Sequence, residues 1–158
     1  MNDPEAAPRT VIVGVGNLLM KDEGVGIHAV RRLQELDLPE DIEIVDGGTS
    51  PDLVAYVGPG DRLIIVDAAR AGGEPGAVYR FRPEDLAHEA ADLASAHQLG
   101  VVPNLKLLEL AGAAPREVVI IGVEPEEIAP GLELTDTLAA RLAVVVDVVL
   151  REAGLKGG

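Results

Sequence analysis

The stretch from Val11 to Gly26, VIVGVGNLLMKDEGVG, decides the fold of this chain. An uninterrupted β-branched run from Thr10 to Val15 predicts a strand that is buried on both faces of a parallel sheet. Gly14 and Gly16 then allow the backbone to turn sharply before the next element. The pattern of strand, glycine turn and helix predicts the first βα unit of an α/β domain.

An acidic pair, Asp22 and Glu23, follows the glycine turn. We expect Asp22 to cap the next helix and Glu23 to lie in its first turn, where the positive end of the helix dipole favours an anion. Glu23 should therefore lie at the carboxyl edge of the sheet. Acidic residues are also common in first turns for structural reasons alone, so Glu23 by itself does not establish a site.

Further elements follow in the same alternation. Helical spacing of apolar residues and short apolar runs predict strands at 42–45, 63–66, 77–81 and 117–123, and helices at 25–36, 51–57, 99–111 and 135–153. Only the nine residues 68–76 separate the third strand and its Asp67 from the fourth strand. A parallel crossover needs about a dozen residues, so we expect the fourth strand to be an antiparallel edge strand.

The composition agrees with one α/β domain. Of the 158 residues, 47% are hydrophobic but only 2% aromatic, so Val, Leu, Ile and Ala must build the core. We expect a flexible arm at 1–9, a single domain at 10–154 and a short tail at 155–158. Its predicted architecture is a three-layer α/β/α sandwich around a five-stranded, mostly parallel, twisted sheet with one antiparallel edge strand.

Charge and residue usage exclude several functions. The formal net charge is −14, which would repel nucleic acid, so we expect no nucleic-acid partner. No run of apolar residues approaches the length of a membrane span, and the N-terminus has no signal-peptide pattern, so we expect a soluble, cytoplasmic protein without membrane insertion. The chain has no cysteine, so metal ligands would have to be carboxylates or imidazoles.

Several polar residues fall just after strands or at helix starts. Ligands bind at this edge of an open α/β sheet, and the residues are Asn17, Asp22, Glu23, Asp46, Asp67 and His97. Two carboxylates and one imidazole, from Glu23, Asp67 and His97, would suit nickel, zinc or iron and leave coordination positions open. In the structural alternative, Asp67 only shapes a turn and His97 only begins a helix, after a capping box at Ser95 and Gln98. His28 and His88 are weaker candidates.

A dinucleotide site is a second alternative, because the paired glycines follow a strand and precede a helix. Leu19 occupies the place where that fingerprint requires its third glycine. The acidic pair stands where a pyrophosphate would bind, and two negative charges there oppose phosphate binding. A nucleotide-binding α/β module is therefore the weaker interpretation.

Taken together, these segments resemble the hydrogenase maturation proteases, endopeptidases that trim the large subunit of [NiFe] hydrogenases. The resemblance covers Thr10 to about Gly154. Its motifs are GVGNLLMKDEGVG at 14–26, DGGTSPDLV at 46–54, LIIVDAA at 63–69, PGAVYRF at 75–81, SAHQLG at 95–100 and IIGVEPEEIAPGLELTDTL at 120–138. Pro103, within the predicted helix after His97, departs from the pattern and predicts a kink or a delayed start of that helix.

The resemblance implies that Glu23, Asp67 and His97 contact nickel and are the catalytic residues. It also implies that a C-terminal extension of the hydrogenase large-subunit precursor is removed only after nickel insertion, with nickel carried by the substrate and no permanently bound cofactor. Asn17, Asp22, Asp46 and Gly47 match the motifs without an assigned step, and we interpret them as loop-shaping or supporting groups.

The mechanism stays open in part. Nickel would either polarise the scissile carbonyl or activate water, or it would only position the bond. The sequence offers no Ser-His-Asp or Cys-His arrangement, and Asp46 or Asp22 is a candidate general base. A nickel-checking chaperone that binds the precursor without cutting it is the non-enzymatic alternative.

Overall fold

The computed structural model describes residues 8–49, 52–88 and 101–155. Strands and helices alternate along the chain, as the sequence pattern predicts. The elements are β1 (Thr10–Gly14), η1 (a 3₁₀ turn, Lys21–Gly24), α1 (Val25–Gln34), β2 (Ile42–Asp46), α2 (Leu53–Tyr56), β3 (Arg62–Ala68), β4 (Val78–Phe81), α3 (Pro83–His88), α5 (Val101–Leu110), β5 (Glu117–Val123) and α6 (Asp136–Glu152).

The five strands form one sheet in the order β2-β1-β3-β5-β4. The strand pairs β1–β2, β1–β3 and β3–β5 are parallel, whereas β4 pairs with β5 in the antiparallel direction. β4 also lies at the edge of the sheet. The prediction of an antiparallel edge strand, made from the short connection after β3, is confirmed.

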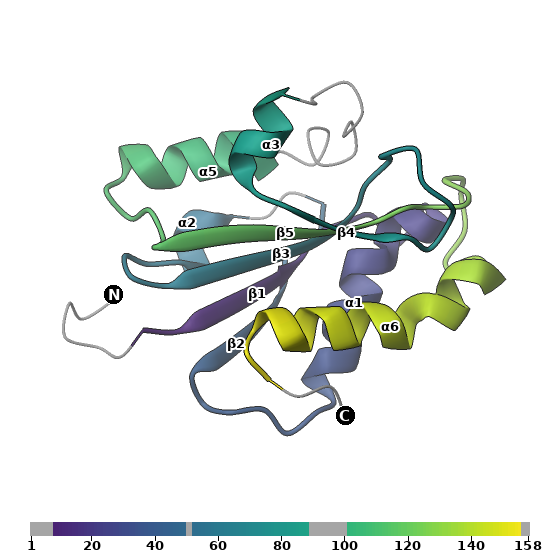
Figure 1. Cartoon of the computed structure of the whole chain (residues 1–158), viewed down its shortest axis with the longest axis horizontal. Helices are drawn as coiled ribbons and strands as arrows, with labels where there is room; N and C mark the ends of the chain where they lie inside the picture. The colour runs from purple at the N-terminus through teal and green to yellow at the C-terminus, as the bar shows by residue number, and fades with distance from the viewer. Residues whose placement is uncertain (1–7, 50–51, 89–100, 156–158) are drawn as a thin grey trace.

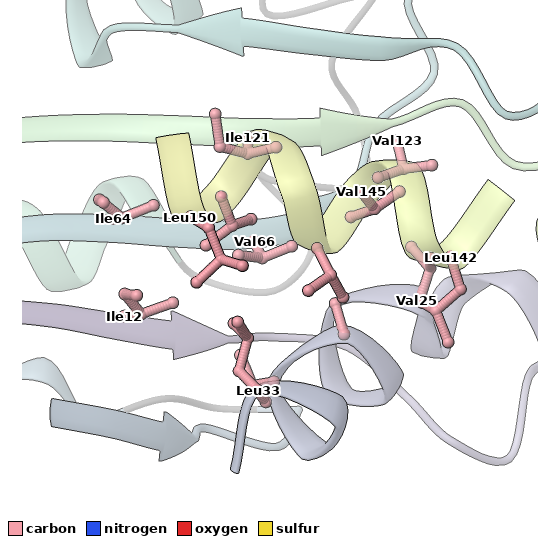
Figure 2. Packing of buried hydrophobic residues seen from close by; sticks show 14 of the residues in the cluster. Ile12, Val25, Leu33, Ile64, Val66, Ile121, Val123, Leu142, Val145 and Leu150 are labelled. Carbon is pink, nitrogen blue, oxygen red and sulfur yellow. The ribbon is translucent and has the colours of Figure 1, made fainter. Parts of the chain in front are cut away.

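Helices cover both faces of this sheet (Figure 1). α1 and α6 pack on one face, where Ile12, Ile64 and Ile121 of three parallel strands contribute to a buried cluster with both helices (Figure 2). α2 and α5 cover the other face, and Leu53 and Leu108 pack there against residues such as Leu63. The predicted three-layer α/β/α sandwich is therefore confirmed, with an aliphatic core on each side. In the described ranges no helix has both the length and the apolar character that crossing a membrane requires.

Some element boundaries differ from those predicted. β3 runs two residues further than expected, so Asp67 lies inside the strand. The second helix begins at Leu53, after Asp52, rather than at residue 51, which lies outside the described ranges. Pro103 lies within α5, whose described part begins at Val101. The residues before Val101 lie outside the described ranges, so the kink or delayed start expected from Pro103 stays a prediction.

A network of ion pairs closes the amino edge of the sheet. Arg62, at the start of β3, pairs with Glu117 of β5 and with Glu152 near the end of α6. Arg80 Nε lies 2.6 Å from Glu152 Oε1, and Arg82 is within 3.7 Å of Glu117. Hydrogen bonds from Arg62 lower the pKa of Glu117, and those from Arg80 and Arg62 lower the pKa of Glu152. The network ties the end of α6 to the central strands.

Candidate active site at the carboxyl edge

The strand order places a topological switch point between β1 and β3. The connection after β1 leads through α1 to β2 on one side, whereas the connection after β3 leads toward β4 and β5 on the other side. In open α/β sheets, ligands bind at such a switch point, just beyond the carboxyl ends of the two strands. Glu23 follows β1, and Asp67 lies near the end of β3. The topology therefore brings the two predicted carboxylates to the same place.

Close backbone packing holds η1 and α1 against these strand ends. A Cβ atom at Gly26 would lie 2.1 Å from the carbonyl oxygen of Val66 and 2.6 Å from that of Val15. A Cβ atom at Gly16 would lie 2.2 Å from the carbonyl oxygen of Glu23. Both distances are far shorter than a non-bonded contact permits, so only glycine allows the helix start to pack on the sheet this closely. The glycines of the opening motif thus place Glu23 beside β3.

Asp67 has an unusual environment for an acidic residue. Its side chain is fully buried, and neither carboxylate oxygen has a hydrogen-bond partner among the described residues. Burial raises the pKa of Asp67 well above its usual value. The nearby N–H of Ala68 offsets part of this effect without the geometry of a full hydrogen bond, and the negative charge of Glu23 raises the pKa further. A buried carboxylate without a partner is rare, and it marks a group that a cation would stabilise.

Glu23 is half-buried within η1, and η1 packs against β3. Its negative charge acts on Asp67, which shows that the two carboxylates are electrostatic neighbours. Within residues 8–49, 52–88 and 101–155, no group of three potential ligand side chains is arranged to hold a metal ion. The described part of the predicted triad is therefore a carboxylate pair.

His97, the predicted third ligand, lies outside the described residues, as does the predicted capping box of Ser95 and Gln98. The helix predicted after it is present as α5. α5 covers the same face of the sheet toward which Asp67 alternates, because Leu63 and Ile65 of β3 belong to the cluster that contains Leu108. The role of His97 stays a prediction.

Asp22 does not cap α1, contrary to the prediction. The N-cap position of α1 is Gly24, and the side chain of Asp22 turns away toward the segment 126–135. The carboxylate is fully buried and accepts hydrogen bonds from the N–H groups of Glu126, Glu127 and Thr135 and from the Thr135 hydroxyl. With its oxygens occupied in this way, Asp22 is a structural acceptor, and these contacts do not support it as a candidate general base.

The other motif residues shape loops. Asn17 Oδ1 accepts a hydrogen bond from the Leu19 N–H at 2.9 Å, which closes the turn after β1. Asp46 Oδ1 accepts from the Gly48 N–H at 3.2 Å, and Asp46 Oδ2 lies 3.4 Å from Arg31 Nε. The interpretation of Asn17 and Asp46 as loop-shaping residues is confirmed. A general-base role for Asp46 is not tested by these contacts.

Glu124 is a buried residue that sequence reasoning missed. It follows β5, and its Oε1 atom accepts hydrogen bonds from the N–H groups of Ala71 and Gly73 and from the Tyr79 hydroxyl, at 2.8, 3.1 and 2.7 Å. Burial and the bond to Glu124 raise the pKa of Tyr79. Glu124 thereby fixes the loop that leaves β3 just after Asp67. Its partners are 45 to 53 residues away in the chain, so no local pattern could identify them.

Neither His28 nor the dinucleotide alternative adds to this site. His28 lies on α1 and lines a shallow depression of about 330 Å³ with Arg32, Leu134 and Asp136, and neither Glu23 nor Asp67 lines it. The pKa of His28 is lowered, mainly by burial. The dinucleotide alternative also fails, since the start of α1 packs on strand backbone and η1 precedes it with a buried carboxylate.

Comparison with known proteins agrees with this geometry. Residues 27–152 match the family model described as hydrogenase maturation protease. The "Hydrogenase 2 maturation protease" of Escherichia coli (strain K12) is 35% identical over 154 residues, which cover 94% of this chain and 94% of that protein.

Two solved structures have the same fold. The hydrogenase maturating endopeptidase HybD from E. coli matches with a TM-score of 0.80 and 34% identity, over 94% of this chain and 95% of that chain. The [NiFe] hydrogenase maturation protease HybD from Thermococcus kodakarensis matches with a TM-score of 0.77 and 32% identity, over 92% and 99% of the two chains. Sequence and fold therefore point to the same group of proteins.

Proposed function

The chain belongs to the hydrogenase maturation protease family, and from that premise we propose that it removes the C-terminal extension of a [NiFe] hydrogenase large-subunit precursor after nickel insertion. In this proposal Glu23, Asp67 and His97 recognise nickel that the precursor carries. The observation that supports it most strongly is the buried carboxyl group of Asp67 at the switch point of the sheet, whose oxygens have no hydrogen-bond partner among the residues that the structure describes.

Burial of the Asp67 carboxyl group costs free energy. A buried ionised carboxylate without partners costs several kcal/mol, and the charge of Glu23 adds to the cost. A divalent cation beside both carboxylates would remove the repulsion between them and supply the missing partner. The site is thus suited to bind a cation when one arrives, at the expense of stability when none is present.

The donor set also explains why the metal would come with the substrate. Two carboxylates and one imidazole leave coordination positions open, and this chain has no thiolate to fill them. Cysteine thiolates of the precursor would hold the nickel, and Glu23, Asp67 and His97 would complete its shell. A precursor without nickel would then lack the group that the carboxylate pair recognises.

The residues of this chain bind and orient the metal-bearing end of the precursor. Glu124 and the glycine contacts keep the loops around the site in place, so the carboxylates need little rearrangement on binding. Bound nickel supplies a Lewis acid that can polarise the scissile carbonyl or activate water. Positioning of the scissile bond alone is the other mechanism, and Asp46 is the candidate general base in either case.

The test compares nickel-loaded and nickel-free forms of one large-subunit precursor, each mixed with the purified protein. We expect C-terminal trimming of the loaded form only, detected by intact-mass measurement, with each enzyme molecule acting more than once. Trimming of both forms at equal rates would refute the recognition of substrate-borne nickel. Stoichiometric binding without trimming would support a nickel-checking chaperone instead.

Metal analysis of the purified protein completes the test. We expect sub-stoichiometric nickel and zinc in the isolated enzyme, because the three-ligand site is incomplete without the precursor. A full equivalent of tightly held zinc that sustains trimming of nickel-free precursor would indicate an ordinary zinc peptidase.

A further inference from the structure

We propose that Asp22 is a positioning residue for precursor trimming, and that it sets the location of Glu23 by fastening η1 to the segment 126–135. The inference rests on the proposed function, because it assigns a role relative to the nickel contact of Glu23. Asp22 itself has no room to contact the substrate, since its side chain is fully buried.

The contacts of Asp22 describe a clamp between two distant parts of the chain. Asp22 Oδ2 accepts from Glu126 N at 2.9 Å, from Glu127 N at 3.0 Å and from Thr135 Oγ1 at 2.8 Å, and Oδ1 accepts from Thr135 N at 2.8 Å. These partners are 104 to 113 residues away in sequence. The clamp therefore joins η1, after β1, to the connection between β5 and α6.

Both side-chain oxygens of Asp22 accept hydrogen bonds from uncharged donors. Backbone N–H groups and a hydroxyl occupy both oxygens, and Thr135 is also the N-cap residue of the 17-residue helix α6, whose positive dipole end favours an anion. An amide at position 22 would turn an NH₂ group toward these donors and break part of the clamp. Because the clamp requires two acceptor oxygens at position 22, Asp22 differs from a residue that only fills space.

Glu23 depends on this clamp because η1 is a single 3₁₀ turn with little stability of its own. Other anchors of η1 include the Lys21 N–H bond to the Gly131 carbonyl at 3.0 Å, the Asp22 N–H bond to the Glu127 carbonyl at 3.3 Å and the partly exposed Lys21–Glu127 ion pair. α1 is held separately, through the packing of Gly26 on the strand ends. Loss of the Asp22 carboxylate would therefore loosen the turn that carries Glu23, which keeps these weaker anchors to the segment 126–135, while the helix behind it stays in place.

The test measures trimming of nickel-loaded precursor by Asp22→Asn, Thr135→Val and Thr135→Ser, at a temperature where circular dichroism shows each variant folded. We expect kcat of Asp22→Asn to fall about 10-fold to 100-fold, as for other outer-shell partners of metal ligands. Thr135→Val, which loses only the hydroxyl, should fall about fivefold. Thr135→Ser keeps the hydroxyl and should retain wild-type kcat.

Asp61→Asn is the matched control. Asp61 is also a buried carboxylate that accepts a backbone hydrogen bond, from Gly58 N at 2.8 Å, but it precedes β3 at the opposite edge of the sheet and pairs with Arg9. We expect this variant to lose stability and keep kcat. An equal loss of kcat in Asp61→Asn and Asp22→Asn would overturn the proposal, because general destabilisation would then explain both.

Glu23→Ala distinguishes a failure of the proposed function from a failure of the positioning role of Asp22. If Glu23→Ala fails to trim while folded Asp22→Asn trims at the wild-type rate, the positioning role of Asp22 is refuted and the proposed function stands. If Glu23→Ala trims normally, the proposed function itself fails. Should Asp22→Asn not fold, wild-type kcat in Thr135→Val would refute the clamp.

Discussion

The two edges of the sheet treat their carboxylates in opposite ways. At the amino edge, Glu117 and Glu152 lie among arginines, and their pKa values are lowered. At the carboxyl edge, Asp67 is buried without a partner in the described structure, beside Glu23, and its pKa is raised. The amino edge thus stabilises the fold, whereas the carboxyl edge retains a destabilising group, as expected of a functional site.

The largest expected effect tests the carboxyl edge directly. Asp67→Asn keeps the size of the side chain and removes its charge, so trimming of nickel-loaded precursor should fall by more than about 100-fold, the upper value for mere supporting residues. The same variant should be more stable than the wild type at pH 7, because a costly buried charge is gone. Intact-mass kinetics and urea denaturation measure the two effects.

Asp67→Asn that trims at the wild-type rate would contradict the assignment of Asp67 as a ligand. Asp67→Asn that is less stable than the wild type at pH 7 would contradict the comparison between the edges. The trimming rate thus tests the ligand assignment, and the stability tests the comparison between the edges, each independently of the other.

The next effect concerns the amino edge. Arg62→Met should destabilise the protein by about 2 kcal/mol, between the values for exposed and for buried ion pairs, because the pairs are partly exposed and Arg80 and Arg82 remain beside the two carboxylates. For a chain of this size, that corresponds to a fall in Tm of roughly 4 to 8 °C. Differential scanning calorimetry measures the shift, and kcat for the folded variant should stay at the wild-type value.

A third prediction uses pH to separate the edges. At a pH below 3.8, the ordinary pKa of an aspartate, Asp67 is protonated in both the folded and the unfolded chain. As the pH rises, Asp67 ionises first in the unfolded chain, because its pKa is raised in the folded chain. Asp67 therefore lowers the free energy of unfolding progressively as the pH rises. The stability advantage of Asp67→Asn should therefore grow from about pH 4 upward. Urea denaturation of both proteins between pH 4 and pH 8 gives this difference, and a constant difference would contradict it.

At the amino edge, the carboxylates should have the opposite effect on the pH dependence of stability. The lowered pKa values of Glu117 and Glu152 stabilise the fold above the ordinary value of 4.5, and that contribution is lost as pH falls through the lowered values. In Glu152→Gln the loss of stability relative to the wild type should be largest near neutral pH and shrink below about pH 4. The two variants would thus change stability in opposite directions at pH 7.

The smallest effect is expected for His28, which lies apart from the carboxylate pair on α1. Its lowered pKa means that the folded chain favours the neutral ring, so His28 destabilises the fold as pH falls below 6.5. His28→Gln should leave kcat unchanged and show a small gain in stability at pH 5.5 that disappears at pH 8. A loss of trimming in this folded variant would extend the site beyond the carboxyl edge.

Much of the fold could be predicted because local patterns determine it. The buried run at Thr10–Val15, the spacing of apolar residues in α1 and the short connection before β4 each depend on neighbours in sequence. The convergence of Glu23 and Asp67 could also be predicted, because parallel strands end at a common edge. The bonding of Asp22 and Glu124 could not be predicted, since their partners are 45 to 113 residues away and depend on the packed fold.

The packing of Gly26 on the ends of β1 and β3 has a consequence for protein engineering. Main chain rests on main chain there, so the start of α1 is held against the end of β3 without any contribution from the side chains at positions 23 and 67. A single cysteine or histidine introduced at either position would therefore enter an existing geometry, in a chain that has no competing thiol. Under the proposed nickel contact, ligand exchange at these positions would shift metal preference from harder carboxylate donors toward softer sulfur or nitrogen donors, with the backbone left as it is.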